Sequence, residues 1–413
     1  MWNKIKTGFQ NTAGYFTDEL KIIWHDAGAV LIFIGAMIVY PLFYSIAYQN
    51  ETVRDNPLAV VDLDHSALSR QMSRMVDASE QLKVTCKPGS LKEAEQLFYD
   101  GDIKGIMLIP DDFEKDILKG IQTKVTVYCD ASYFLLYKQV YSGAIYSSGT
   151  FGAGIEIKKM LGEGKTLIQA MDQQEPLKVK SYNLYNPSGG YSNFVMPGII
   201  LIIMQQTLLI GIGLLGGTTR ERNRFHHHKG PVALPGGSAA AVLGKSGAYL
   251  LIYLFNSLYA MLMVPEWFSF PDQSGFLPVL ILLIPFILSI CFLGLAISVL
   301  FKRRVNSLLF MVFLSPCILF LSGLSWPASS IPPALYSLAH IFPSTLMVPA
   351  YLRLRIFGAD FSSVSYEWVW MFVQMTAYFI LACFAYKLAR IRFDKENAAE
   401  ISEEFSVNSK IVK

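Results

Sequence analysis

The stretch Leu277–Leu300, LPVLILLIPFILSICFLGLAISVL, decides the fold class of this chain. It holds 17 Leu, Ile, Val or Phe residues and no charged residue. At about −0.4 kcal/mol for each of these residues, insertion into a bilayer gains roughly −7 kcal/mol before the cost of Pro278 and Pro285. About 20 apolar residues are enough for a helix to cross the hydrocarbon core. The stretch therefore predicts a membrane-spanning helix.

Five further stretches are apolar and long enough to cross, so we expect six spanning helices. With Leu277–Phe301 as the fourth, the others are Ala27–Tyr48, Phe194–Gly216, Gly247–Phe268, Ser307–Trp326 and Trp368–Ala389. The composition agrees, because 53% of the residues are hydrophobic and only 16% are charged, against about 25% charged in soluble domains. The net charge of +3 is too small to indicate a nucleic-acid partner.

Basic residues are concentrated on one side of the predicted spans. The second-to-third loop is basic, Lys302–Arg304 lies between the fourth and fifth spans, and the last span is followed by Arg390 and Arg392. The third-to-fourth loop, Ser269–Phe276, has no Lys or Arg. The positive-inside rule places both termini in the cytoplasm. We expect the membrane to be a bacterial inner membrane. The first span has no small-residue cleavage site and is expected to be a signal anchor.

The regions between and around the spans suggest five parts. They are a cytoplasmic interfacial helix at 1–26, a first span at 27–48, an extracytoplasmic α/β domain at 49–193, spans two to six at 194–389, and a cytoplasmic tail at 390–413. The first part is expected to be an amphipathic helix, because Phe9, Phe16, Leu20 and Ile23 recur at near-helical spacing. A frayed terminus is the alternative.

Segment 49–193 alternates short β-rich runs with helical patterns. The expected strands are 58–63, 82–86, 105–109 and 124–129, with helices at 67–76, 91–99 and 112–118, before a helical return from 133 to 173. This alternation predicts a small α/β unit. Asp62, Asp64 and His65 could indicate a metal or acid–base site, but capping at a strand end explains these residue types better.

Five cysteines show no zinc-like spacing. Cys86 and Cys129 each end a predicted strand in the outer domain, so a disulfide between them is possible. The compartment permits such a bridge without requiring it.

The stretch between the fifth and sixth spans is interrupted by Pro327, Pro332 and Pro343 and contains Gly323 and Trp326. It is too broken for one spanning helix and too apolar for a water-exposed loop. Non-helical backbone at membrane depth occurs only where protein or a water-filled cavity satisfies its polar groups. We therefore expect a re-entrant helical hairpin at 327–358, on the outer side, acting as a gate.

The predicted spans contain almost no ionisable residue. Gln205, Gln206 and Asn256 are the main polar side chains and are candidates for lining a pathway. Ion-coupled carriers normally keep carboxylates or histidines in their spans, so energy is expected to come from a cytoplasmic subunit. The basic loop 217–246 would be its docking surface, although simple anchoring by positive charge is an alternative and both can hold.

Two motifs in that loop are weak evidence for a phosphate-binding loop and for a metal site. Gly244-Lys245-Ser246 resembles the end of a phosphate-binding loop, but Ala239 stands where the motif needs glycine. His226-His227-His228 could hold a metal, yet three adjacent residues do not readily converge on one ion, so a solvated loop is favoured. We expect no metal site, no catalytic set and no enzymatic activity in this chain.

Four sets of residues, in this order, extend over nearly the whole chain. They are Trp24-His25-Asp26 with Pro41; Val60-Val61-Asp62-Leu63-Asp64-His65-Ser66 with Gly105-Ile106-Met107-Leu108-Ile109-Pro110; Tyr185-Asn186-Pro187 with Asn193-Phe194-Val195-Met196-Pro197-Gly198; and Ser322-Gly323, Trp326-Pro327, Phe342-Pro343-Ser344, Arg353 and Gly358. With them the chain resembles the ABC-2 type exporter permeases, most closely the branch with a large domain after the first span.

The resemblance implies a permease dimer in the lipid bilayer, driven by two cytoplasmic ABC ATPase subunits that bind the ATP and Mg²⁺. This chain itself would bind no cofactor. Arg220, Glu221 and Arg222 lie where the family has its ATPase-coupling segment, but the family's usual second acidic residue and Gly-Thr are replaced by Asn223-Arg224-Phe225. A periplasmic adaptor and an outer-membrane channel could be further partners.

Two other functions stay open at this point. A membrane-anchored receptor or envelope assembly scaffold would use the outer domain to bind a ligand or an envelope protein, but it would need no broken helix at membrane depth. An enzyme acting within the membrane would need an intramembrane catalytic set, and the sequence shows none.

Overall fold

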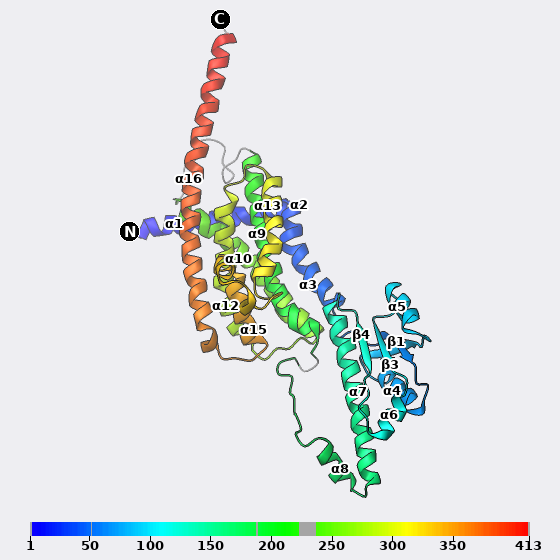
Figure 1. Cartoon of the computed structure of the whole chain (residues 1–413). Helices are drawn as coiled ribbons and strands as arrows, with labels where there is room; N and C mark the ends of the chain where they lie inside the picture. Colours follow the sequence, from blue (N-terminus) through cyan, green and yellow to red (C-terminus); the bar gives the residue numbers. More distant parts are fainter. Residues whose placement is uncertain (1, 51, 187–188, 223–236, 412–413) are drawn as a thin grey trace. The chain divides into compact units, whose positions relative to one another are not determined.

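The chain forms two compact units in a computed structural model that describes residues 2–50, 52–186, 189–222 and 237–411 (Figure 1). The helical unit comprises Met1–Glu51 and Asn183–Lys413, and the α/β unit comprises Thr52–Tyr182. The α/β unit lies within the predicted domain at 49–193.

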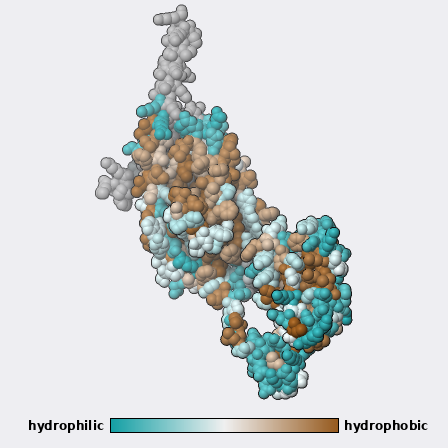
Figure 2. Space-filling model, in the orientation of Figure 1, coloured by the Kyte–Doolittle hydropathy of each residue, from teal (hydrophilic) through white to brown (hydrophobic). Residues whose placement is uncertain are grey.

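Among the residues that the structure describes, six helices of the helical unit are long and apolar enough to cross a membrane, the number that the sequence predicts. They are Ala27–Ala47, Tyr191–Glu221, Gly237–Trp267, Phe276–Ser298, Arg304–Leu321 and Phe361–Arg392. The second and fourth are mostly buried within the unit, whereas the first, fifth and sixth are mostly exposed. Brown, hydrophobic residues cover much of the visible face of this unit (Figure 2), as expected for a surface that meets lipid.

The elements of the helical unit are named as in Figure 1. They are α1 (Trp2–His25), α2 (Ala27–Val30), η1 (Leu31–Gly35), α3 (Ala36–Ala47), α9 (Tyr191–Glu221), α10 (Gly237–Leu258), η2 (Tyr259–Met263), α11 (Val264–Trp267), α12 (Phe276–Ser298), α13 (Arg304–Leu321), η3 (Ala328–Ser330), α14 (Pro333–Ala339), α15 (Ser344–Arg355), η4 (Phe361–Val364) and α16 (Ser365–Ile411). The central helix α12 packs against α9, α10, α15 and α16. The first and third spans each contain a π-helical segment, η1 and η2.

The N-terminal segment is a helix, as predicted, and it packs along α10 through two glycines of that helix. A Cβ atom added at Gly244 would lie 2.5 Å from the Thr12 carbonyl oxygen and 2.6 Å from the Tyr15 Cβ, and one at Gly247 would lie 3.2 Å from the Phe16 ring. Small residues at such crossings let two helix backbones approach closely. The place of α1 at a membrane interface stays a prediction.

The predicted loop 217–246 is too long. Helix α9 continues through Glu221, and α10 is described from Gly237. Within this predicted loop, Gly244 lies on a helical surface against which α1 packs. Lys245 therefore lies in a candidate span, and the expectation that the spans carry almost no ionisable residue is wrong at this position. The histidines His226–His228 lie outside the described residues.

Segment 327–358 forms the predicted pair of short helices, α14 and α15. Pro327, Pro332 and Pro343 stand immediately before η3, α14 and α15, which suits a residue with fixed φ and no N–H. Gly323 ends the preceding turn with φ +81°, a conformation that favours glycine. Helix α15 is mostly buried and packs against α9, α12 and α16, whereas α14 is mostly exposed. Whether the pair enters a membrane stays a prediction.

The α/β unit has a four-stranded sheet in the order β2-β1-β3-β4. Its elements are β1 (Asn56–Asp62), α4 (Ala67–Asp77), β2 (Leu82–Cys86), α5 (Leu91–Tyr99), β3 (Gly105–Ile109), α6 (Phe113–Lys119), β4 (Thr126–Cys129), α7 (Phe134–Gly162) and α8 (Leu167–Gln174). Strand β1 is parallel to β2 and β3, and β4 is antiparallel to β3. Side chains alternate along β1, so that one face packs on α4, α6 and α7 and the other on α5. The predicted strands and helices are confirmed.

The acidic residues at the end of β1 are caps, as predicted. Asp62 Oδ1 accepts hydrogen bonds from the backbone N–H groups of Asp64 and His65, at 3.2 and 3.0 Å, and Asp62 Oδ2 accepts one from the Ser69 hydroxyl at 2.7 Å. Asp64 Oδ2 accepts the N–H of Glu114 at 3.1 Å. These side chains fix the turn that leads from the sheet into α4.

The suggested disulfide between Cys86 and Cys129 is not found, and both thiols are free. Cys86 ends β2 and Cys129 ends β4, and these strands form opposite edges of the sheet. Three strand spacings of about 4.8 Å separate them, whereas a disulfide needs Cα atoms within about 7 Å. The strand order, which the sequence did not reveal, excludes the bridge.

Candidate functional site

Charged side chains of the helical unit gather where the first, third and fifth spans begin and the second ends. We call this region the basic end. It comprises Glu19 on α1, Asp26 before α2, Thr218–Arg222 at the end of α9, Lys245 on α10 and Arg304 at the start of α13.

Arg304 joins the first, second and fifth spans. Its guanidinium forms two hydrogen bonds to Asp26, Nη1 to Oδ2 at 2.6 Å and Nη2 to Oδ1 at 2.9 Å, and a third to the Thr218 hydroxyl at 3.2 Å. Its backbone N–H donates to Glu221 Oε2 at 3.2 Å. A two-bond pairing of this kind fixes both distance and orientation. The end of α9 and the starts of α2 and α13 are therefore bonded to one another.

The charge state of Asp26 follows from these bonds. Its partial burial alone would raise the pKa of the carboxyl, but the Arg304 guanidinium and the Ala29 N–H, which donates to it at 3.0 Å, bring the pKa below its usual value. Asp26 is also the N-cap of α2, a position where a negative charge is stabilised. The carboxylate is therefore ionised at neutral pH.

Two glycines make room for this pairing. A Cβ atom at Gly28 would collide with Nη2 of Arg304, and one at Gly217 would lie 2.7 Å from the Arg304 Cα. The three segments can meet closely only because neither position carries a side chain.

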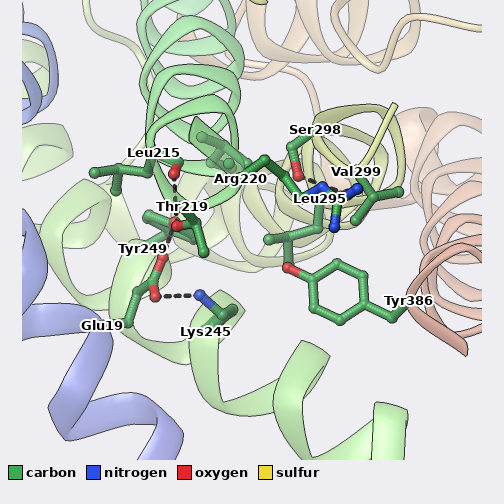
Figure 3. A pocket seen from close by; sticks show the side chains of 12 residues that line it. Glu19, Leu215, Thr219, Arg220, Lys245, Tyr249, Leu295, Ser298, Val299 and Tyr386 are labelled. Carbon is green, nitrogen blue, oxygen red and sulfur yellow. Dashed lines mark hydrogen bonds and ion pairs between the residues drawn. The ribbon is translucent and has the colours of Figure 1, made fainter. Parts of the chain in front are cut away.

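A second ion pair at the basic end is almost fully buried. The Lys245 ammonium and the Tyr249 hydroxyl both donate to the carboxylate of Glu19 (Figure 3). The side chains of Lys245 and Glu19 are only 7% and 3% exposed. Removing one partner of such a pair leaves an uncompensated buried charge. The pair therefore ties α1 firmly to α10.

This pair borders a small cavity with both polar and apolar lining residues. The cavity, of about 20 Å³, is also lined by Thr219, Arg220 and Tyr386 (Figure 3), and a volume of this size holds about one water molecule. A second cavity of about 150 Å³ is lined by His25, Asp26, Thr218 and Arg222, among others. The basic end is therefore not tightly packed, and its polar side chains have space to rearrange.

The predicted coupling residues all lie at this end. Arg220 is half-buried beside the first cavity, Glu221 is bonded to the Arg304 N–H, and Arg222 is exposed and borders the second cavity. The residues that follow, 223–236, lie outside the described part of the chain. The coupling segment is thus connected to the starts of two other spans.

The three amides predicted to line a pathway instead join helices in this conformation, so their role in a pathway remains a prediction. Gln205 is fully buried and holds Ser344 at the start of α15, donating to its hydroxyl at 3.0 Å and accepting its N–H at 2.9 Å. Gln206 donates to the Ser315 carbonyl at 3.2 Å. Asn256 donates to the Phe33 carbonyl at 2.7 Å.

The opposite end of the helical unit, which we call the far end, holds Arg353 and Arg355 of α15. Arg355 is 3% exposed and donates to the Met261 carbonyl and to Asp272, both at 2.7 Å. Arg353 pairs with Glu367 at the start of α16 and donates to the Ser363 carbonyl at 2.8 Å. These bonds hold the last turn of α15, whereas Gln205 holds its first.

Sequence reasoning missed both ion pairs at the basic end. One signal was present, because Glu19 stands three residues after Phe16 and four before Ile23 and so shares their apolar helix face. An acidic residue on such a face calls for a buried partner. For Asp26 and Arg304, the only signal was opposite charge on the same predicted side.

No group of three or more His, Cys, Asp or Glu side chains able to hold a metal occurs among the described residues. Lys245 lies within a helix and is bonded to Glu19, so it does not belong to a phosphate-binding loop.

A comparison with sequence models of protein families identifies the family of this chain. The sequence model described as "ABC-2 family transporter protein" matches residues 28–384. The chain belongs to the ABC-2 transporter family. No curated protein matches it. As an ABC-2 permease it is a multi-pass membrane protein, and its family implies association with an ABC ATPase. The match takes in the α/β unit but not α1, so the Glu19–Lys245 pair connects the family region to a helix outside it.

Proposed function

We propose that this ABC-2 permease forms the translocation pathway of an ATP-driven exporter, as a dimer coupled to separate cytoplasmic ATPase subunits. The observation that carries the proposal is the Arg304 network, which links the predicted coupling segment to the starts of the first and fifth spans. The excess of basic residues supports a cytoplasmic position for this end.

In this mechanism, closure of the ATPase pair pushes on Arg220–Arg222. The push passes through Glu221 to the backbone of Arg304 and through its guanidinium to Asp26, so that three spans move together. Export then requires the cargo to interact differently with the inward and outward states. The cavities at the basic end supply the space for such a shift.

A dimer is supported by the surface of α13. Phe313, Phe320 and Leu309 of this helix are 77%, 62% and 61% exposed. The same helix begins with Arg304, which joins the three spans. A second copy would cover part of this apolar surface, and lipid would cover the rest.

The pair α14–α15 is proposed as the gate at the outer face. Gln205 and Arg355 hold α15 at both ends, while α14 is mostly exposed. Replacing Pro327 and Pro332 with alanine is expected to impair export while the α/β unit stays folded. Export at the wild-type rate would argue against a gate here.

The coupling role is tested with the double variant Arg220→Glu/Arg222→Glu. Its matched control is Lys387→Glu/Arg392→Glu, which reverses two exposed basic residues of α16 next to the same end. We expect the wild type and the control to copurify with an ABC ATPase and change its hydrolysis rate, because their coupling segment is intact. The coupling variant should insert normally but lose most of this effect.

Two outcomes would contradict the proposal. Unchanged ATPase regulation in the coupling variant would remove the docking role of Arg220–Arg222. Transport by the purified chain on a proton or sodium gradient, without any ATPase, would exclude the proposed function as a whole.

A further inference from the structure

The largest cavity described in the α/β unit is an open groove between α4, α6 and α7. Its volume of about 610 Å³ falls within the range of small-molecule sites, about 300–1,000 Å³. All of its lining residues belong to the α/β unit. We call it the α7 groove.

The floor and walls of the α7 groove are apolar. They are formed by Leu68, Met75, Ile117, Phe151 and Ile155, and Phe151 stacks on Phe113 with ring centroids 6.1 Å apart. Phe151 belongs to the buried core, with the other four packed against it. The floor is therefore built on a fixed core rather than on a loop.

One glycine keeps the groove open. Gly154 lines the groove from α7. It lies midway between Thr150 and Lys158, which are each about one helical turn away. A Cβ atom added at Gly154 would meet nothing within 4 Å. The space is therefore real volume beside the helix, into which a side chain could be built without disturbing the backbone.

The rim of the groove is basic. Lys119, at the end of α6, and Lys158 and Lys159, near the end of α7, are all exposed. Within the described part of the chain, no carboxylate lies within 4.0 Å of any of these three ammonium groups. Three lysines without an ion pair in the described structure thus lie beside the apolar groove.

We propose that the α7 groove binds a single-chain amphiphile with an anionic head, its hydrocarbon tail on Leu68, Met75 and Phe151 and its carboxylate or phosphate on the three lysines. Burying the tail gains about 0.8 kcal/mol per CH₂ group, and the lysines select for negative charge. The lining residues of this site do not include any residue of the Arg304 network. The result of the binding test is therefore independent of the proposed export function.

The test uses the full-length chain in nanodiscs of zwitterionic phosphatidylcholine, with 11-(dansylamino)undecanoic acid as the probe and empty nanodiscs as the baseline. We expect a saturable rise in fluorescence above the baseline that weakens with added salt, since the contacts to the head are ionic. The absence of saturable binding above that of empty nanodiscs would overturn the proposal.

Gly154→Leu should fill the groove and weaken binding at least about tenfold, which corresponds to about 1.4 kcal/mol. Its matched control is Gly152→Leu, on the same helix but outside the groove, where a Cβ also meets nothing within 4 Å. Far-ultraviolet circular dichroism checks that both variants stay folded. Equal affinity of Gly154→Leu and the wild type would place the probe elsewhere and refute the site.

The head group is tested separately. Lys158→Gln/Lys159→Gln should weaken binding several-fold and reduce its salt dependence. Dodecanoate and dodecyl phosphate should both displace the probe, and their relative strength distinguishes a carboxylate ligand from a phosphate one. Displacement by neutral dodecanol that is as strong as by dodecanoate would refute the role of the lysines.

Discussion

The basic end and the far end of the helical unit use charge differently. At the basic end, carboxylates from α1 and from the residue before α2 pair with cations on α10 and α13, so each ion pair joins two long helices. At the far end, both arginines belong to one short helix and bind a loop residue, a helix start and backbone carbonyls. The first arrangement couples helices to one another, whereas the second holds one helix in place.

The difference in burial sharpens this comparison. Glu19 and Lys245 are both nearly inaccessible, whereas Asp272, the partner of Arg355, is 39% exposed. Loss of a carboxylate should therefore cost much more at the basic end than at the far end.

Glu19→Gln should give the largest effect, a loss of about 3–5 kcal/mol in the free energy of unfolding, because Lys245 is left buried without a counter-charge. Asp272→Asn should cost less, since Asp272 itself is 39% exposed and the buried Arg355 guanidinium keeps its hydrogen bond to the Met261 carbonyl. Thermal unfolding of the purified variants in one detergent measures both. Adding Lys245→Met to Glu19→Gln should restore most of the loss. Equal losses for Glu19→Gln and Asp272→Asn would abolish the distinction between the two ends.

Gly244→Ala should have the next largest effect, about 1–3 kcal/mol, because its Cβ would press on the backbone of α1 at Thr12. Gly247→Ala is the matched control, since its Cβ would meet only the Phe16 ring, at 3.2 Å, and an aromatic ring can turn. The same unfolding measurement applies. If the control loses as much stability as Gly244→Ala, close backbone approach is not what joins α1 to α10.

The Asp26–Arg304 pair should give the smallest effect, about 1 kcal/mol, and one that depends on pH. The folded-state pKa of Asp26 is lowered, so its contribution is present in full above the unfolded-state pKa, about 3.9, and is lost as the pH falls through the folded-state value. Unfolding temperatures of the wild type and Asp26→Asn should differ at pH 7 and converge below about pH 4. A difference that stays constant down to pH 3 would mean that this carboxylate contributes nothing through its charge.

Much of the fold could be predicted because local patterns determine it. Leu277–Leu300 has to be a buried or membrane-embedded helix by composition alone. The helices at 67–76 and 91–99 follow Ser66 and Ser90, whose hydroxyls accept the N–H groups of Ser69 and Glu93. These signals lie within a few residues of the elements that they define.

The features that were mispredicted depend on contacts between distant segments. Whether Cys86 and Cys129 can meet depends on strand order, which no local pattern encodes. Lys245 was assigned to a loop because the predicted third span begins at Gly247, whereas Gly244 and Gly247 lie on a helix and contact α1. Of the candidate site, the coupling residues could be placed by position, but the bond between Glu221 and Arg304 could not.

The π-helical segment η1, in the first span between Asp26 and α3, has one further consequence. A π turn contains one residue more than an α turn, and the Phe33 carbonyl in this turn accepts the Asn256 amide. If that bond broke and the extra residue moved out of the turn, everything on one side would rotate by about 100° and advance by about 1.5 Å. Such a rearrangement of η1 would turn the Asp26 end of the first span relative to its other end.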